Sequence, residues 1–327
     1  MNETRPIRWG FLGAGKILGK IGTAFQLTDR AELVAIASRD LSRAEAAAKT
    51  YGAKRAVAGY EALLADPEVD VVFNALHNGL HCEWTVRALE AGKHVLCEKP
   101  LACSVAEVER MFAAAHANRR WLMEAFMYRF QPQISEVKRR VDAGEIGRLL
   151  HIRASYATKG RELENPRYWR DAGGGALMDV GCYCVNAARL FAGSEPVRVS
   201  AQAHFQNVDL TLAGTLEFAG NVTAHIVCSF ESEGVYSIEV TGTDGKLLIP
   251  NPWLPAGNYG ELILTRAGKS ETIRIPTPHQ YSHFAGEIDH FSDCVRENRA
   301  PTVVTEADSR GNMQVMEALL ASARASV

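Results

Sequence analysis

The first 124 residues alternate between short apolar runs and segments with helical spacing. In the first such segment Ile17, Ile21 and Phe25 recur every four residues, which is typical of an amphipathic helix. The apolar runs that separate these segments cover 7–12, 33–37, 69–76, 94–97 and 122–126. Short apolar strands separated by helices predict a parallel sheet with helices on both faces. Because crossovers between parallel strands are right-handed, we expect residues 1–124 to form a doubly wound α/β domain.

The pattern changes after about residue 125. Helical spacing continues at 132–143, 175–191 and 306–325, but many strand-like segments now follow one another closely. These segments cover 197–205, 208–218, 222–230, 235–240, 247–249, 262–265 and 272–275. Alternating short strands joined by turns predict an antiparallel sheet with one covered face. We therefore expect residues 125–327 to form an α+β domain with a large, mostly antiparallel open sheet.

Composition narrows the functional class. The 327 residues hold 36 Lys and Arg against 38 Asp and Glu, a formal net charge of −2, so we expect neither a nucleic-acid nor a membrane partner. No run of apolar residues is long enough for a transmembrane helix, and the first residues lack the apolar core of a signal peptide. The seven cysteines are odd in number and irregularly spaced. They fit reduced thiols in a cytoplasmic protein better than a disulfide framework.

A glycine pair closes the first predicted strand and opens the first predicted helix. Gly13 permits a tight turn, and Gly15 lets the backbone approach a pyrophosphate whose charge the helix N-terminus favours. The match to the dinucleotide pattern G-x-G-x-x-G is imperfect, because Leu18 takes the sixth position and Gly19 follows one residue late. The surrounding strand and helix still favour a dinucleotide-binding Rossmann domain over a turn without a ligand.

The end of the second predicted strand bears on the choice of cofactor. Many NAD sites carry an acidic residue there for the ribose hydroxyls, whereas this chain has Ser38 and Arg39, with Arg43 four residues on. A hydroxyl and guanidinium groups suit a 2′-phosphate. We therefore expect NADP in preference to NAD; in the alternative, Asp40 binds the ribose of NAD.

Two further positions carry candidate chemistry. Lys99 follows the strand at 94–97, and the carboxyl ends of parallel strands meet at the ligand-binding edge of such a sheet. Asp179 is the only acid in an otherwise apolar helical segment, and Tyr183 lies four residues later on the same face. Taken alone, that pair is as compatible with a buried structural hydrogen bond as with a catalytic site.

Several motifs in sequence order together resemble the Gfo/Idh/MocA oxidoreductases, in particular the branch of glucose–fructose oxidoreductase, dimeric dihydrodiol dehydrogenase and NADP-dependent xylose dehydrogenase. They lie at 13–17, 37–39, 78–81, 92–100, 124–129 and 173–183, spread over more than half the chain. The resemblance implies that Lys99, Asp179 and Tyr183 line the nicotinamide, with Tyr183 where the inositol dehydrogenase branch has His. It also implies a sugar, polyol or diol substrate and a homodimer or homotetramer formed through the C-terminal sheet.

The resemblance extends the set of cofactor-binding residues. Besides Gly13, Gly15, Ser38, Arg39, Arg43 and Lys99, it implies Lys16, Ile17, Leu76, Asn78, His81 and Glu98. One departure concerns His77, which stands where the family usually has Pro before the residue equivalent to Asn78.

These residues allow hydride transfer between a nicotinamide and a secondary alcohol or carbonyl. Tyr183 is the candidate base in oxidation and acid in reduction. A free tyrosine titrates near pH 10, so a neighbouring positive charge such as Lys99 must favour its ionised form. Asp179 then orients substrate or pairs with Lys99. In the alternative assignment Lys99 transfers the proton and Tyr183 positions the substrate.

The substrate itself cannot be deduced from these motifs. Residues able to surround a polyhydroxy ligand are Tyr128, Arg129, Trp169 and Arg170, with Arg161 and Tyr168 near them in sequence. A metal site at His77, His81 and Cys82 is disfavoured, because Asn78 and Gly79 suggest a loop and no second metal-binding motif accompanies them. A protein that binds the nucleotide without turnover is the remaining alternative.

Overall fold

The computed structural model describes residues 5–160, 164–254 and 257–325. Contacts divide the chain into two compact units. The first unit comprises 1–102, 106–130 and 281–309, and the second comprises 103–105, 131–280 and 310–327. The predicted domain limits, 1–124 and 125–327, follow the order of the chain and stay a prediction, because the first unit also takes in a segment near the C-terminus.

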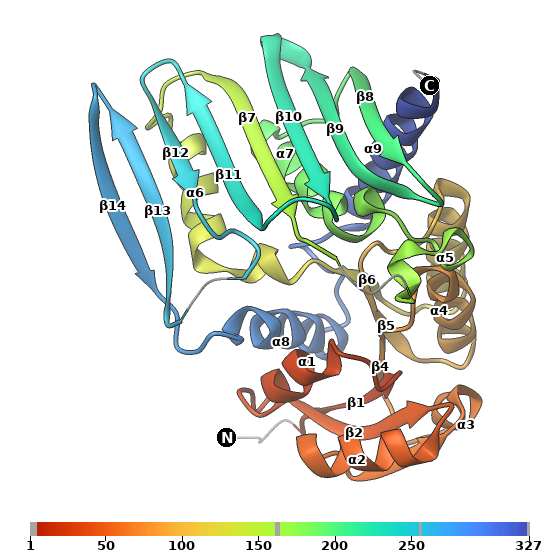
Figure 1. Cartoon of the computed structure of the whole chain (residues 1–327). Coiled ribbons are helices and arrows are strands. Elements are labelled where there is room, and N and C mark those ends of the chain that lie inside the picture. The colour runs from red at the N-terminus through yellow and green to blue at the C-terminus, as the bar shows by residue number, and fades with distance from the viewer. Residues whose placement is uncertain (1–4, 161–163, 255–256, 326–327) are drawn as a thin grey trace. The chain divides into compact units, whose positions relative to one another are not determined.

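The first unit is built on a six-stranded parallel sheet with the order β3-β2-β1-β4-β5-β6 (Figure 1). Its strands are β1 (Ile7–Leu12), β2 (Ala31–Ser38), β3 (Arg55–Ala58), β4 (Val71–Asn74), β5 (His94–Glu98) and β6 (Leu122–Ala125). The helices between them are α1 (Leu18–Phe25), α2 (Leu41–Tyr51), α3 (Tyr60–Leu64), α4 (His81–Glu90) and α5 (Val105–Ala117). The doubly wound parallel sheet is confirmed. Its strand order reverses between β1 and β4, where such sheets bind ligands.

Burial explains why this sheet is specified so clearly. The central strands are apolar on both faces, and the rings of Phe11 on β1 and Phe73 on β4 stack 4.9 Å apart. Helix α8 (Ser282–Arg296) completes the unit beside α1. Trp9 joins the two, since its ring contacts Phe25 and Phe291 edge-on and its indole N–H donates to the hydroxyl of Ser292.

The second unit is built on an eight-stranded sheet with the order β14-β13-β12-β11-β7-β10-β9-β8. Its strands are β7 (Leu149–Ala157), β8 (Arg198–Phe205), β9 (Asp209–Phe218), β10 (Val222–Ser229), β11 (Val235–Gly242), β12 (Gly245–Ile249), β13 (Tyr259–Arg266) and β14 (Lys269–Pro276). All neighbouring pairs are antiparallel except β7 and β10. The mostly antiparallel sheet is therefore confirmed.

Helices cover one face of this second sheet. They are α6 (Pro132–Asp142), α7 (Cys182–Ala192) and α9 (Glu306–Ala325), and they lie behind the strands in Figure 1, whose near face carries no helix. In β10 the residues Ala224, Ile226 and Cys228 are buried against the helices, whereas His225 and Val227 alternate with them on the open face. This alternation is the period of two that the sequence showed.

Among the α-helices and strands of the described residues, β3, α3, β7 and α8 escaped the sequence analysis. Strand β7 carries polar residues on its open face and so lacks a continuous apolar run. Helix α8 buries His283, Glu287 and Ser292, polar residues that conceal its helical apolar stripe. In the part of the chain that the structure describes, no helix has the length and apolar character that crossing a membrane requires.

Candidate active site

The glycine turn after β1 has the geometry that a bound pyrophosphate needs. Gly13 has a φ of +99°, which favours glycine, and its N–H donates to the carbonyl of Ala37 on β2. A Cβ atom at Gly15 would meet nothing within 4 Å, so the backbone there faces open space. Close helix packing is provided by Gly22 and not by Gly19, since a Cβ at Gly22 would lie 2.5 Å from the ring of Tyr51. The turn therefore fits a dinucleotide.

Helix α2, which follows β2, places the guanidinium of Arg43 at the same glycine turn. The guanidinium of Arg43 on α2 donates to the carbonyl of Ala14 at 2.9 Å, and Arg39 is exposed beside it in sequence. Asp40 is the N-cap of α2, and its Oδ1 accepts hydrogen bonds from the backbone N–H and the hydroxyl of Ser42. These bonds lower the pKa of Asp40 below its usual range. The carboxylate of Asp40 therefore caps α2, while the choice between NADP and NAD stays a prediction.

The side chain of His81 links the loop that follows β4 to the loop that follows β5. Its side chain is fully buried, and its ring nitrogens lie 2.9 Å from the carbonyl oxygens of Pro100 and Leu76. Burial lowers the pKa of His81 to about 4, although the hydrogen bonds to these two carbonyl groups act in the opposite direction. Asn78 begins the short 3₁₀ turn before it. His81 thus shapes the turn that carries Leu76 and Asn78, while its own contact with a cofactor stays a prediction.

Lys99 lies in a group of charged residues at the carboxyl end of β5. The carboxylate of Glu98 accepts the backbone N–H of Lys99, and the bond from Lys99 to Pro100 is cis. The next residue, Leu101, donates its N–H to the buried carboxylate of Glu124 on β6. Lys20 on α1 is close enough for its charge to be influenced by Glu98 and Lys99, although burial is the main cause of its lowered pKa.

Helix α8 adds two buried polar groups that the sequence analysis did not identify. His283 and Glu287 are one turn apart, and both are almost completely buried. Burial raises the pKa of Glu287 well above its usual range and lowers the pKa of His283 to about 3, so burial favours the uncharged form of each side chain. The positive charge of Lys20 also lowers the pKa of His283, and the negative charge of Glu98 also raises the pKa of Glu287. The spacing of these two residues on a helix was the only signal available in the sequence.

In the second unit, Asp179 lies in a π-helical turn, Leu177–Gly181, immediately before α7. Its carboxylate pairs with the guanidinium of Arg167 at 3.4 Å, and its side chain is 21% exposed. Arg167 also lies over the ring of Phe230. Asp179 is therefore a partly accessible, charge-paired carboxylate, and Arg167 is a partner that the sequence analysis missed.

Tyr183 lies in a group of aromatic rings on the helix-covered face of the second sheet. Its ring centroid is 5.5 Å from those of Tyr156 on β7 and Trp253, which stack on each other. The indole N–H of Trp253 donates to the carbonyl of Ser155, and Gln131 donates to the carbonyl of Trp253. Tyr236 on β11 contacts the far side of Tyr156 and is 38% exposed. The Tyr183 ring is thus held in a rigid aromatic setting.

The four predicted substrate-binding residues have different surroundings. Tyr128 is fully buried, and Arg129 donates to the carbonyl of Val303 and lies 3.7 Å from Asp308. Trp169 is 47% exposed, and Arg170 next to it is exposed. Trp169 and Arg170 therefore have the access that a ligand contact requires, and all four roles stay predictions. Arg161 lies outside the described residues.

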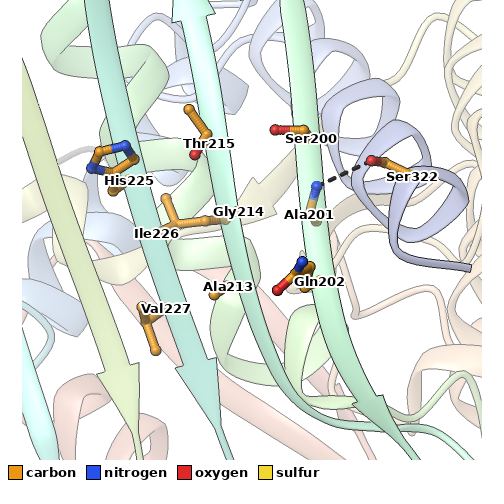
Figure 2. Close-up of a pocket in the computed structure, with 10 residues that line it drawn as sticks. All are labelled: Ser200, Ala201, Gln202, Ala213, Gly214, Thr215, His225, Ile226, Val227 and Ser322. Carbon is orange, nitrogen blue, oxygen red and sulfur yellow. Dashed lines mark hydrogen bonds between the residues drawn. The ribbon is translucent and has the colours of Figure 1, made fainter. Parts of the chain in front are cut away.

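The described residues form no metal site, and a groove lies outside the predicted active site. No group of three or more His, Cys, Asp or Glu side chains there could hold a metal ion. The open face of the second sheet has a groove of about 420 Å³ over β8, β9 and β10. Figure 2 shows its lining, Ser200, Ala201, Gln202, Ala213, Gly214, Thr215, His225, Ile226, Val227 and Ser322. The lining contains no residue that the sequence analysis placed in the active site.

Comparison with known proteins agrees with this geometry. Residues 7–126 match the model of an oxidoreductase family with an NAD-binding Rossmann fold, and residues 134–248 match the GFO/IDH/MocA C-terminal domain. The chain is 36% identical to D-xylose 1-dehydrogenase (NADP(+)) 2 of Haloferax volcanii, over 96% of this chain and 97% of that protein. It is 32% identical to the trans-1,2-dihydrobenzene-1,2-diol dehydrogenase of Bos taurus, over 89% of each.

Solved structures give the same result for the fold. A 3-ketoreductase from Actinomadura kijaniata, in complex with NADP and TDP-benzene, superposes with a TM-score of 0.91 at 33% identity. That match covers 97% of this chain and 98% of the other. An aldose-aldose oxidoreductase from Caulobacter crescentus, complexed with glycerol, also has a TM-score of 0.91, at 29% identity and 99% coverage of both chains.

Proposed function

The chain belongs to the Gfo/Idh/MocA oxidoreductase family, and we propose that it transfers hydride between NADP(H) and a secondary alcohol or carbonyl of a sugar, polyol or diol. It is an NAD(P)-binding dehydrogenase or reductase acting on CH–OH groups. The observation that carries the proposal is the placement of Lys99. It follows β5 at the carboxyl edge of the parallel sheet, the edge at which the Gly13 turn leaves β1.

The proposed roles of the site residues follow from their settings. Bound NADP would supply the nicotinamide ring that accepts or donates hydride. Gly13, Gly15, Lys16 and Ile17 hold the pyrophosphate, Ser38, Arg39 and Arg43 hold the 2′-phosphate, and the remaining cofactor contacts come from Leu76, Asn78, His81, Glu98 and Lys99. Arg43 also secures the glycine turn through Ala14.

Proton transfer is assigned to the residues at the reacting carbon. Tyr183 takes the proton from the substrate hydroxyl in oxidation and returns it in reduction. Lys99 contributes the positive charge that favours an ionised oxygen next to it. Asp179, charge-paired with Arg167, orients a second substrate hydroxyl by accepting its hydrogen bond. Tyr128, Arg129, Trp169 and Arg170 complete the proposed substrate contacts.

A substrate panel tests this function directly. Purified protein is incubated with aldoses, ketosugars, inositols and trans-dihydrodiols in the presence of NADP or NAD, and the reduced nicotinamide is followed by its absorbance. We expect turnover with at least one of these compounds, and faster turnover with NADP. Tight nucleotide binding without turnover on any compound in either direction would instead support the inactive binding protein.

Arg39 gives a prediction about the cofactor. Replacement of Arg39 by Ala is expected to raise the Kd for NADP about 10- to 100-fold, because a charge-assisted bond to the 2′-phosphate contributes roughly 1.5–3 kcal/mol. The Kd for NAD, which has no such phosphate, is expected to change less than about twofold by the same reasoning. Fluorescence titration of both nucleotides measures this difference. Lys49→Ala, which removes an exposed cation of the following helix α2, serves as the control. An equal loss for the two nucleotides would contradict the assignment.

We further propose that the protein is a homodimer or homotetramer formed through the open face of the second sheet. This face presents the groove of Figure 2 together with the exposed side chains of Val227 and Val235. Apolar side chains exposed on an open sheet favour a second sheet as their cover, and an isologous contact would bury the same patch on both copies.

The assembly is tested by adding a charge to this face. Val227→Glu is expected to convert the oligomer into a monomer, measured by sedimentation velocity, because two carboxylates would be buried across the two-fold axis. Leu27→Glu, at a similarly exposed apolar residue of the first unit, is the control and should leave the assembly intact. A wild-type protein that sediments as a monomer would refute the proposal.

We also propose a cytoplasmic location for the protein, because all seven cysteines are free thiols.

A further inference from the structure

The segment that carries Asp179 and Tyr183 begins without a cap of its own. Its N-cap residue is Ala176, whose side chain can accept no hydrogen bond, and the first turn, Leu177–Gly181, is π-helical. The first N–H groups of any helix have no acceptor within the helix. Since Leu177 is buried, its N–H requires an acceptor from elsewhere in the fold.

Asp209, the first residue of β9, provides that acceptor. Its Oδ2 accepts the N–H of Leu177 at 2.7 Å, and the residue is 3% exposed. The neighbouring Gly175 has a φ of +125°, and a Cβ atom there would lie 2.1 Å from Oδ1 of Asp209. Only glycine at this position therefore allows the carboxylate to reach the start of the segment.

Burial disfavours the charged form of the Asp209 carboxylate. Burial raises the pKa of Asp209 to about 6, although backbone N–H groups, that of Leu177 foremost, and the positive charge of Arg324 on α9 act in the opposite direction. Cys228 on β10 also lies near Asp209, and burial raises the pKa of its thiol well above the usual range. The charged group of the capped segment, Asp179, pairs with Arg167, which precedes the segment.

The same segment is fixed at two further points. A Cβ atom at Gly181 would lie 2.7 Å from the Sγ of Cys228, so the segment lies directly on β10. At the other end, the N–H of Gly175 donates to the carbonyl of Arg167 at 2.8 Å. The backbone between Gly175 and Gly181 is thus clamped between two strands and a turn, with Asp209 as the only charged group of β9 among these contacts.

We propose that Asp209 is a positioning residue, whose carboxylate fixes the start of the segment 176–183 and thereby the orientation of Asp179 and Tyr183. Its catalytic consequence rests on the proposed function, whereas the hydrogen bond to Leu177 can be tested without any turnover. Asp209 touches the backbone of the segment and acts on the reaction only through it.

The kinetic test compares two variants at this residue. Asp209→Ala removes both acceptor oxygens and is expected to lower kcat about 10- to 100-fold, as small displacements of catalytic groups do. The KM for NADP, which binds the first unit, should stay within about twofold, since only the second unit is altered. Asp209→Asn keeps one oxygen in place and should recover kcat to within about threefold of wild type, because a neutral acceptor remains.

A matched control removes a charge from the other end of α7. Glu195→Gln removes the negative charge that pairs with the buried guanidinium of Arg189, 2.5 Å from Glu195. This control is expected to lower the melting temperature while kcat stays within about twofold of wild type, because the start of the segment is untouched. If Asp209→Ala retains full kcat, or loses no more than the control does, the positioning role is refuted.

Hydrogen exchange tests the hydrogen bond between Leu177 and Asp209 without measuring activity and without the variant Asp209→Ala. In the wild-type protein the amide of Leu177 should be protected, although it lies at a helix start. In Asp209→Asn the same amide should exchange about tenfold faster. The increase should be confined to residues 176–183. An unprotected Leu177 amide in the wild type would overturn the proposal, whereas absence of turnover with protection intact would refute only the proposed function.

The pH dependence of stability offers a second signature of the buried carboxyl. The pKa of Asp209 in the folded chain, about 6, is higher than the 3.8 of a free carboxyl, so its ionisation disfavours the folded state. The wild type should therefore lose melting temperature relative to Asp209→Asn as the pH rises from about 4 to about 6, and remain offset above that range. Parallel curves would show that the carboxyl is not buried in this contact.

Discussion

Replacement of Lys99 by Met is expected to abolish turnover while NADP binding survives. Methionine keeps most of the length of the side chain but has no ammonium group, so it eliminates both the positive charge and any proton that Lys99 supplies. The backbone of this loop is held by other groups, since Leu101 binds Glu124 and Pro100 binds His81. Loss of the ammonium group should therefore leave the nucleotide site in place.

The measurement combines steady-state kinetics with nucleotide titration. We expect no detectable turnover for Lys99→Met and a Kd for NADP within a few fold of wild type, since the phosphate-binding residues lie elsewhere. Lys54→Met is the control, because Lys54 is an exposed cation of the first unit that pairs with Glu32. Normal turnover in Lys99→Met would remove Lys99 from the mechanism. Equal loss of binding and turnover would restrict it to a role in holding the cofactor.

The parts of the fold that could be predicted from the sequence are those encoded by local patterns. Strand β4 is apolar up to its last residue, Asn74, and β10 alternates with a period of two, so both could be recognised without knowledge of their neighbours. Similarly, Gly13 and Lys99 could be identified because each directly follows a strand whose end is defined by its own sequence. Such residues depend on only a few neighbours along the chain.

The parts that could not be predicted depend on partners far apart in sequence. Arg167 pairs with Asp179 across a turn, and Asp209 reaches Leu177 over 32 positions. Neither residue lies in a motif, because a cap or an ion pair of this kind can be provided by any strand that passes nearby. Helix α8 shows the same limit, since His283 and Glu287 occupy buried positions where the pattern demands apolar residues. Polar groups buried near a candidate site thus obscure the secondary-structure signal there.

Replacement of Tyr183 by Phe is expected to lower kcat about 10²- to 10⁴-fold, the usual contribution of a positioned acid or base. The substitution removes only the hydroxyl. The ring remains in its contacts with Tyr156 and Trp253, and Trp253 remains bound to Ser155 and Gln131. Stability and the Kd for NADP should therefore be close to wild type, and the loss should appear in kcat and in its pH dependence.

The pH profile separates the two assignments of the proton. If Tyr183 transfers it, the residual activity of Tyr183→Phe should lose the limb of the kcat profile that reports the ionisation of the base, because phenylalanine has no group that ionises. If Lys99 transfers it and Tyr183 only positions the substrate, the limb should persist and KM should rise. Tyr259→Phe on β13, where the ring lies under Arg274, controls for removal of a tyrosine hydroxyl. An unchanged kcat in Tyr183→Phe would exclude the phenol from proton transfer and leave Lys99 as the group that carries it.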